Sequence, residues 1–218
     1  MKTFNLEHIK AAIFDIDGTM IDNMPFHKKA WKEFCARKGI HLSDGDFKQN
    51  ISGLRNDQIC KNLFGDTITE AEIEAYAAEK ESVYRELYKP HIHEVAGLTE
   101  MLNSIKKRDK KLAIATTAPK ENREFVLNAL GLEEYFEVIL GEEDVQKGKP
   151  DPEIYLKTAE LLGVAPDSCI VFEDSPVGVA SAKNAGMTVV GITTTHSEDE
   201  LEKADIIVQN FTELKLVE

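Results

Sequence analysis

The stretch Ala11-Ala12-Ile13-Phe14-Asp15-Ile16-Asp17-Gly18-Thr19 is an apolar run that ends in an acidic turn. Four consecutive apolar residues are typical of a strand that is buried on both faces, as in a parallel sheet. Aspartate and glycine are ordinary turn residues, so Asp15 and Asp17 could simply close the strand. They would also stand at its carboxyl end, where open parallel sheets bind their ligands.

Five further apolar runs follow along the chain. They comprise residues 112–115, 136–140, 169–172, 188–192 and 205–208. Four helical patterns lie among them, over residues 98–107, 121–130, 152–162 and 176–185. Strands that alternate with helices predict an α/β fold. We therefore expect a three-layer, Rossmann-like core with a mostly parallel sheet.

The region between the first strand and residue 91 breaks this alternation. It shows no convincing strand, and its apolar stripes favour helices. The run Thr69-Glu70-Ala71-Glu72 is a capping box and predicts the start of one of them. We expect a small all-helical cap over residues 22–91, inserted after the first strand. Residues 1–21 and 92–218 would then form the α/β core.

Composition and charge argue against several classes of partner. The 218 residues carry a formal net charge of −13, whereas nucleic-acid binders usually present a basic face. No apolar run approaches the roughly 18 residues that a membrane span requires. Cys35, Cys60 and Cys169 are odd in number and far apart, as expected of reduced thiols. We expect a cytoplasmic monomer that acts on a small molecule, without nucleic-acid or membrane partners.

Residues suited to phosphate chemistry follow four of the predicted strands. They are, in chain order, Asp15 and Asp17, Thr116 and Thr117, Lys149, and Glu173 with Asp174. Carboxylates crowded at one edge of a sheet repel each other, and a divalent cation removes the conflict. An all-oxygen ligand set suits Mg²⁺. With Lys149 and the Thr116 hydroxyl, the set matches a phosphoryl group that is attacked by a carboxylate.

Four motifs make the chain resemble the phosphotransferases of the haloacid dehalogenase superfamily. In order, they are Asp15-Ile16-Asp17-Gly18-Thr19, Thr116, Lys149-Pro150-Asp151-Pro152 and Glu173-Asp174-Ser175. The resemblance spans nearly the whole chain. It points to the subgroup that carries a helical cap after the first motif, which includes β-phosphoglucomutase and sugar-phosphate phosphatases.

The resemblance implies a role for each motif residue. Asp15 would attack phosphorus and form an aspartyl-phosphate, and Asp17 would serve as general acid and then general base. Thr116, Thr117 and Lys149 would bind the phosphate. Mg²⁺ would be held by the metal set, which comprises Asp15, the backbone carbonyl of Asp17, Asp174 and the neighbouring Glu173.

The cap is where the resemblance places substrate contacts. His27, Trp31 and Lys80 match positions in β-phosphoglucomutase, although Trp31 could instead belong to the cap core. Lys80 falls on an apolar stripe, and a buried ammonium needs a partner, for which a substrate anion is one candidate. Arg55, in Gly53-Leu54-Arg55-Asn56, comes one place earlier than the arginine of the related cap loop.

These observations favour one function over two others. We expect a Mg²⁺-dependent phosphatase that hydrolyses a small phosphorylated metabolite, such as a sugar phosphate, through an aspartyl-phosphate. The first alternative is a β-phosphoglucomutase-like mutase, in which a sugar hydroxyl replaces water. The second is a non-catalytic phosphometabolite-binding protein, whose motifs would be degraded. The sequence does not choose between water and a sugar hydroxyl as the acceptor.

Overall fold

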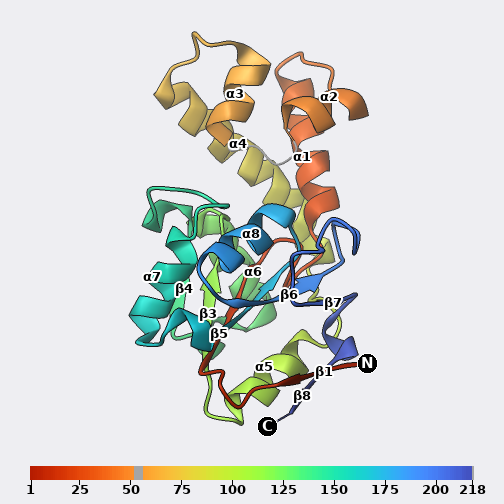
Figure 1. Ribbon diagram of the computed structural model, residues 1–218. Helices are drawn as coiled ribbons and strands as arrows, with labels where there is room; N and C mark the ends of the chain where they lie inside the picture. The colour runs from red at the N-terminus through yellow and green to blue at the C-terminus, as the bar shows by residue number, and fades with distance from the viewer. Residues whose placement is uncertain (52–55, 218) are drawn as a thin grey trace. The chain divides into compact units, whose positions relative to one another are not determined.

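The computed structural model describes residues 1–51 and 56–217, which divide into two compact units (Figure 1). The α/β unit comprises Met1–Asp22 and Ile92–Glu218, and the helical unit comprises Asn23–His91. The helical unit therefore starts one residue later than the cap expected at residues 22–91.

A six-stranded sheet forms the centre of the α/β unit, in the order β4-β3-β2-β5-β6-β7. Its strands are β2 (Ala11–Phe14), β3 (Lys111–Ala115), β4 (Val138–Leu140), β5 (Cys169–Glu173), β6 (Thr188–Ile192) and β7 (Ile206–Val208). Every neighbouring pair is parallel. The predicted parallel α/β core is confirmed, and each of the six expected apolar runs overlaps one of these strands.

Helices cover both faces of the sheet and complete the three layers (Figure 1). They are α5 (Leu98–Lys106), α6 (Lys120–Leu130), α7 (Glu153–Leu162) and α8 (Pro176–Asn184). The crossovers that contain α5 and α6 run toward β4, and those that contain α7 and α8 run toward β7. Because such crossovers are right-handed, the two pairs of helices lie on opposite faces.

Side chains alternate between the two faces of the sheet, as they must in any strand. Ile13 and Val171 pack against Tyr155 and other residues of α7 and α8 in one buried cluster. Their neighbours Phe14 and Phe172 point to the other face, where their rings stack at 4.5 Å. The apolar runs are therefore continuous because both faces are buried.

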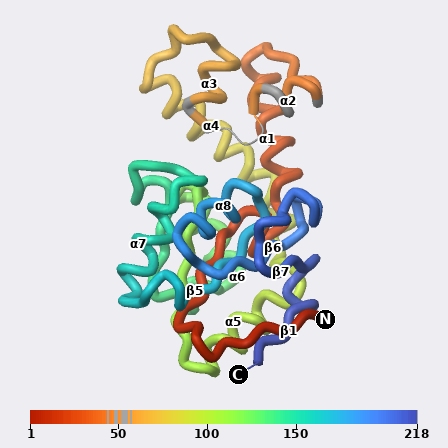
Figure 2. The backbone as a smooth tube through the Cα atoms, in the orientation of Figure 1, coloured from red at the N-terminus to blue at the C-terminus, as the bar shows by residue number. Residues whose placement is uncertain are grey.

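A second, two-stranded parallel sheet joins the ends of the described chain. Strand β1 (Lys2–Asn5) pairs with β8 (Leu214–Val217), side by side at the ends of the tube in Figure 2. Neither strand was predicted, because both are short and partly exposed and so lack an apolar run. The helical insert therefore follows the second strand of the chain, not the first; β2 is the first strand of the main sheet.

The helical unit contains α1 (Met24–Arg37), α2 (Asp44–Asn50), α3 (Asn56–Phe64) and α4 (Glu70–Tyr88). The predicted capping box is confirmed, since the Thr69 hydroxyl accepts from the Glu72 amide and the Glu72 carboxylate accepts from the Thr69 amide. The apolar stripes do not indicate α2, which begins with its own capping box between Ser43 and Asp46.

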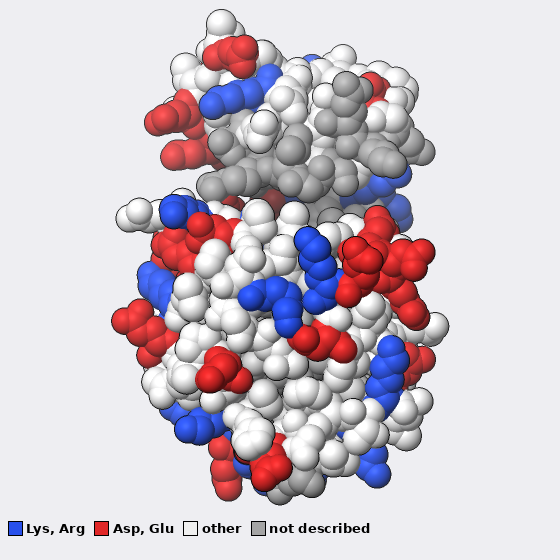
Figure 3. Space-filling view, in the orientation of Figure 1, with Lys and Arg blue, Asp and Glu red and all other residues white. Residues whose placement is uncertain are grey.

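Short 3₁₀ turns link several of these elements. They are η1 (Lys89–His91), η2 (Glu133–Tyr135), η3 (Glu142–Asp144), η4 (Pro166–Ser168) and η5 (Phe211–Glu213). No helix within the described ranges is both long and apolar enough to cross a bilayer. On the face drawn in Figure 3, basic side chains lie among acidic ones and form no continuous basic surface.

Candidate active site

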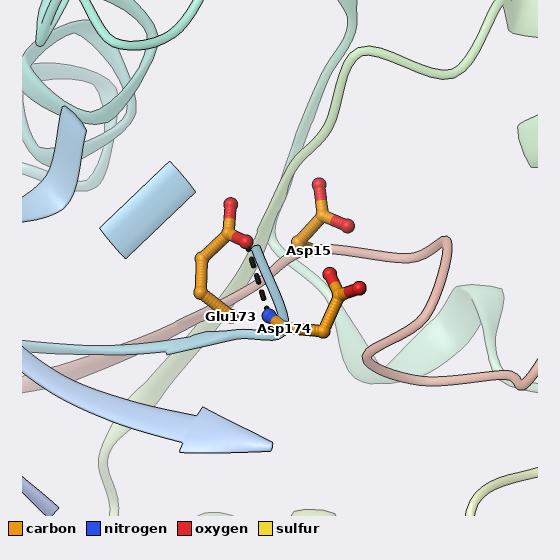
Figure 4. Close-up of side chains that lie close together, drawn as sticks. All are labelled: Asp15, Glu173 and Asp174. Carbon is orange, nitrogen blue, oxygen red and sulfur yellow. Dashed lines mark hydrogen bonds between the residues drawn. The ribbon is translucent and has the colours of Figure 1, made fainter. Parts of the chain in front are cut away.

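Three buried carboxylates meet at the carboxyl ends of the central strands (Figure 4). Asp15 follows β2, Glu173 ends β5, and Asp174 is the next residue. Phe14 is in register with Phe172, so Asp15 lies beside the end of β5. Each of the three carboxylates offers an oxygen, and these atoms all lie within 4.8 Å of one another.

Lys149 enters this carboxylate cluster from the loop that follows β4. Its side chain is only 6% exposed, and its Nζ donates to Asp15 Oδ1 at 2.8 Å and to Glu173 Oε1 at 2.6 Å. A third hydrogen bond, of 3.2 Å, goes to the carbonyl oxygen of Ala115. These acceptors match the three N–H groups of an ammonium, so the side chain is fixed.

Glu173 is held by donors on both of its carboxylate oxygens. Oε1 accepts from Lys149 Nζ and, at 2.7 Å, from the hydroxyl of Tyr155 on α7. Oε2 accepts from the amide of Asp174 at 3.1 Å and from the amide and hydroxyl of Ser175 at 3.4 and 3.2 Å. Gly178 leaves the space for this carboxylate, since a Cβ there would lie 1.9 Å from Oε1.

Two loops each provide a hydroxyl group that donates a hydrogen bond to Asp174. The Thr19 hydroxyl donates to Oδ1 at 3.3 Å, and the Thr195 hydroxyl donates to Oδ2. Gly18 has a φ of +79°, and a Cβ there would lie 2.1 Å from Asp174 Oδ2. The turn of the first motif therefore requires glycine both for its backbone angle and for its close approach to this carboxylate.

The loop after β6, which the sequence motifs do not include, also reaches Asp174. Besides Thr195, it contributes Thr194, whose hydroxyl donates to the Gly18 carbonyl, and His196, whose Nδ1 lies 3.0 Å from the Asp174 carbonyl oxygen. A signal was available, because the polar run Thr193-Thr194-Thr195-His196-Ser197 follows a predicted strand at the same edge of the sheet.

The remaining motif residues lie near the same edge but have fewer recorded partners. Thr116 is buried at the end of β3, and its hydroxyl accepts from the Ala118 amide at 3.2 Å. Thr117 is exposed, and Asp17 is half-buried. As expected, a helix starts just after this loop, with α6 beginning at Lys120. The phosphate-binding and acid–base roles of these residues stay predictions.

Arg123 is a second feature that the sequence did not indicate. It is buried on α6, and its Nη1 donates to the Ala118 carbonyl at 2.7 Å and to Glu143 Oε2 at 3.0 Å. It therefore ties the loop after β3 to the loop after β4. An arginine on an amphipathic helix is usually exposed to solvent. No local sequence pattern therefore predicts that Arg123 links these two loops.

Burial dominates the electrostatics of the carboxylate cluster. It raises the pKa of Asp15 to about 7, although the nearby Lys149 opposes the shift. Burial, with the neighbouring Glu173 and Asp15, also raises the pKa of Asp174 well above its usual range. Burial disfavours the charged form of Lys149, but Asp15 and Glu173 outweigh it and raise the lysine pKa. The cluster thus has more acids than cations.

This arrangement fits a hard divalent cation. The cluster offers oxygen ligands at short mutual distances, and an added positive charge would offset the carboxylate repulsion. Asp15 and Asp174 of this cluster are suited to hold Mg²⁺, and the part of the Asp17 carbonyl stays a prediction. Glu173 is less suited than the sequence implied, because its two oxygens already accept five hydrogen bonds.

Three of the four candidate substrate residues meet within the helical unit. Lys80 Nζ lies 2.9 Å from His27 Nδ1 and 5.2 Å from the centre of the Trp31 ring. It also donates to Glu81 Oε1 at 2.9 Å, so this buried ammonium already has an anionic partner and does not require a substrate anion. Trp31 belongs to the buried core of the unit.

The substrate roles of these residues are not tested by this geometry. Those of His27, Trp31 and Lys80 stay predictions. Arg55 lies outside the described residues.

Comparison with known proteins places this site in a family. The model for haloacid dehalogenase-like hydrolases matches residues 12–192. Validoxylamine A 7'-phosphate phosphatase of Streptomyces hygroscopicus subsp. limoneus is 32% identical, over 94% of this chain and 96% of the relative. β-Phosphoglucomutase of Bacillus subtilis is 29% identical, over 95% of this chain and 92% of the relative.

A solved structure agrees with these relatives over almost the whole chain. A haloacid dehalogenase hydrolase of family IA, variant 3, from Entamoeba histolytica superposes with a TM-score of 0.87 at 34% identity, covering 94% of this chain and 95% of the other. The motifs expected from the sequence, the parallel core and these matches agree: the chain belongs to the haloacid dehalogenase-like hydrolases.

Proposed function

We propose that this protein is a Mg²⁺-dependent phosphatase that hydrolyses a small phosphorylated metabolite of the sugar-phosphate class. The observation that carries the proposal is the position of Lys149, fixed between Asp15 and Glu173 within a buried carboxylate cluster. A carboxylate held beside an ammonium and a metal site is the arrangement that nucleophilic phosphoryl transfer requires. The phosphatase activity named for the Streptomyces relative supports the same class of substrate.

Asp15 supplies the nucleophile in this proposal. Lys149 holds Asp15 Oδ1, and an Asp15 carboxylate oxygen forms the new bond to phosphorus as the bond to the leaving oxygen breaks. Asp17 gives its proton to the leaving alcohol and then takes a proton from water. That water attacks the aspartyl-phosphate, which releases phosphate and restores Asp15. Bound Mg²⁺ would offset the charge shared by the carboxylates and the phosphoryl group.

A β-phosphoglucomutase-like mutase is the second candidate. The similarity to the Bacillus subtilis mutase over nearly the whole of both chains favours it. The first half of the reaction would be the same. In the second half, a sugar hydroxyl would replace water as the acceptor, so the protein would have to shield the aspartyl-phosphate from water.

A panel of phosphate esters, including β-glucose 1-phosphate, tests both candidates with and without Mg²⁺. We expect release of inorganic phosphate that requires Mg²⁺ and falls at least about a thousandfold in Asp15→Asn. Asp167→Asn, at an exposed position of the same unit, is the control and should keep full activity. Glucose 6-phosphate formed faster than inorganic phosphate would favour the mutase. Unchanged turnover in Asp15→Asn would remove the proposed nucleophile.

A further inference from the structure

Tyr155 is a buried side chain of α7 whose hydroxyl reaches the carboxylate cluster. It is fully buried, and its hydroxyl donates to Glu173 Oε1 at 2.7 Å. A buried phenol needs a hydrogen-bond partner, and many core tyrosines find one in a backbone carbonyl. Here the partner is a carboxylate oxygen that also accepts from Lys149, at 2.6 Å. The Tyr155 hydroxyl and the Lys149 ammonium therefore donate to the same oxygen atom.

The ring of Tyr155 contacts the same cation directly. Lys149 Nζ lies 5.1 Å from the ring centre, within the range of a cation–π interaction. The phenol thus touches both partners of one ion pair, with its hydroxyl on the glutamate and its ring on the lysine. No other aromatic ring within the described ranges is recorded over Lys149.

The direction of Lys149 depends on where Glu173 Oε1 is held. Oε2 is fixed by the amides of Asp174 and Ser175, at the start of α8. Among the described residues, the partners of Oε1 are the side chains of Tyr155 and Lys149. Without the phenol hydroxyl, Oε1 would keep, among the described residues, only its bond to Lys149, the side chain that Glu173 itself helps to hold. The hydroxyl is therefore the rigid constraint on this end of the carboxylate.

We propose that Tyr155 is a positioning residue of this site: its hydroxyl holds Glu173 so that Glu173 directs the Lys149 ammonium at Asp15. The inference rests on the proposed phosphatase function, because the atom that is positioned is the one that contacts the nucleophile. It also gives Glu173 a task other than metal binding. That task accounts for its five hydrogen bonds to protein donors.

The test is Tyr155→Phe, which removes the hydroxyl and keeps the ring. With para-nitrophenyl phosphate and saturating Mg²⁺, we expect kcat to fall about tenfold while KM changes less than twofold. Inhibition by vanadate, which takes the geometry of a phosphoryl group in transfer, should weaken by a similar factor. Tyr135→Phe is the matched control, because it removes a hydroxyl that donates to Asn103 elsewhere in the same unit.

A double-mutant cycle separates positioning from a general loss of stability. If Tyr155 acts through Glu173, Tyr155→Phe should change kcat less than twofold in a Glu173→Ala background, which has no acceptor for the hydroxyl. A full tenfold loss in that background would overturn the inference. So would a wild-type kcat and vanadate affinity in the single variant. If wild-type protein turns over no ester, the proposed function fails with it, whereas Asp15-dependent turnover unaffected by Tyr155→Phe overturns the inference alone.

Discussion

Both units bury a lysine, but the charges around the two lysines differ. In the α/β unit, the Lys149 side chain is 6% exposed and bonds to two carboxylates, Asp15 and Glu173. Asp174 adds a third carboxylate, so the acids outnumber the cation. In the helical unit, Lys80 is 3% exposed and bonds to one carboxylate, Glu81, and to His27. Among the described residues, the first group therefore has three carboxylates for one ammonium, whereas the Lys80–Glu81 ion pair has one of each.

The difference indicates what each group can do. Burying a charge is costly unless a partner offsets it, and the Lys80–Glu81 pair offsets itself. In the described residues, the carboxylate cluster has more acids than cations, and burial raises the pKa of Asp15 to about 7. Such a group is stabilised by a bound cation. The charge balance therefore distinguishes a candidate reaction centre from an ion pair in which one ammonium meets one carboxylate.

Among the substitutions considered, removal of Lys149 should cause the largest loss in the free energy of unfolding. In Lys149→Met, Asp15 and Glu173 lose the ammonium that bonds to both of them, and we expect a loss of about 3 kcal/mol in the free energy of unfolding, measured with urea in Mg²⁺-free buffer. Lys147→Met changes a lysine that is 71% exposed two residues away and should cost under about 0.5 kcal/mol. Equal losses in the two variants would contradict the special role of Lys149.

Removing one acid from each unit should change stability in opposite directions. Glu81→Gln leaves Lys80 without its carboxylate, so we expect a loss of about 2 kcal/mol. Asp15→Asn removes a carboxylate whose folded-state pKa is raised to about 7. An acid with a raised pKa destabilises the folded state increasingly as pH rises from the usual value through the raised one. At pH 8 without Mg²⁺, Asp15→Asn should therefore gain about 1 kcal/mol.

Urea unfolding of the two variants, side by side, measures this sign difference. Glu74→Gln, at an exposed position of the same helix as Glu81, is the control for the helical unit and should be neutral. A loss of stability in Asp15→Asn at pH 8 would show that the carboxylate cluster is not strained by its own charge. Saturating Mg²⁺ should remove the advantage of Asp15→Asn, because the cation stabilises the wild-type carboxylates.

The last substitution, Thr195→Val, should act on metal binding. The Thr195 hydroxyl orients Asp174 Oδ2, and loss of such a support typically weakens metal affinity. We expect the dissociation constant for Mg²⁺, from calorimetric titration, to rise about tenfold. Thr193→Val, in the same loop, removes a hydroxyl with no recorded partner in the described residues and should leave the constant unchanged. An unaltered affinity in Thr195→Val would separate this loop from the metal site.

The main elements of the core followed from local sequence patterns. Four consecutive apolar residues predict the strand that ends at Phe14, because they are typical of a strand that is buried on both faces. The capping box at Thr69 predicts the helix that follows it. Strands β1 and β8 escaped detection because each needs the other to form, and they lie more than 200 residues apart. Pairing at that separation leaves no local trace in the sequence.

In the candidate site, too, some residues could be predicted from sequence motifs and others could not. Asp15, Lys149 and Asp174 could be predicted because each belongs to a motif at the end of a strand. Tyr155 could not, because on a helix it reads as a core residue, and its hydroxyl has a partner only once α7 packs on the sheet. Thr195 was missed although its loop follows a predicted strand. In each case the missing information was a contact between distant segments.

By itself, the sequence determined the α/β class, the helical insert and the residues that carry the proposed chemistry, because periodicity, capping and motif order are local properties. Only the tertiary structure decided how those residues are charged and held. It set Lys149 between two carboxylates and gave Lys80 its own partner in Glu81. It also placed hydrogen-bond donors from α7 and from the residues just before α8 around both carboxylate oxygens of Glu173. Charge balance depends on distances between side chains, and those distances exist only when the chain is folded.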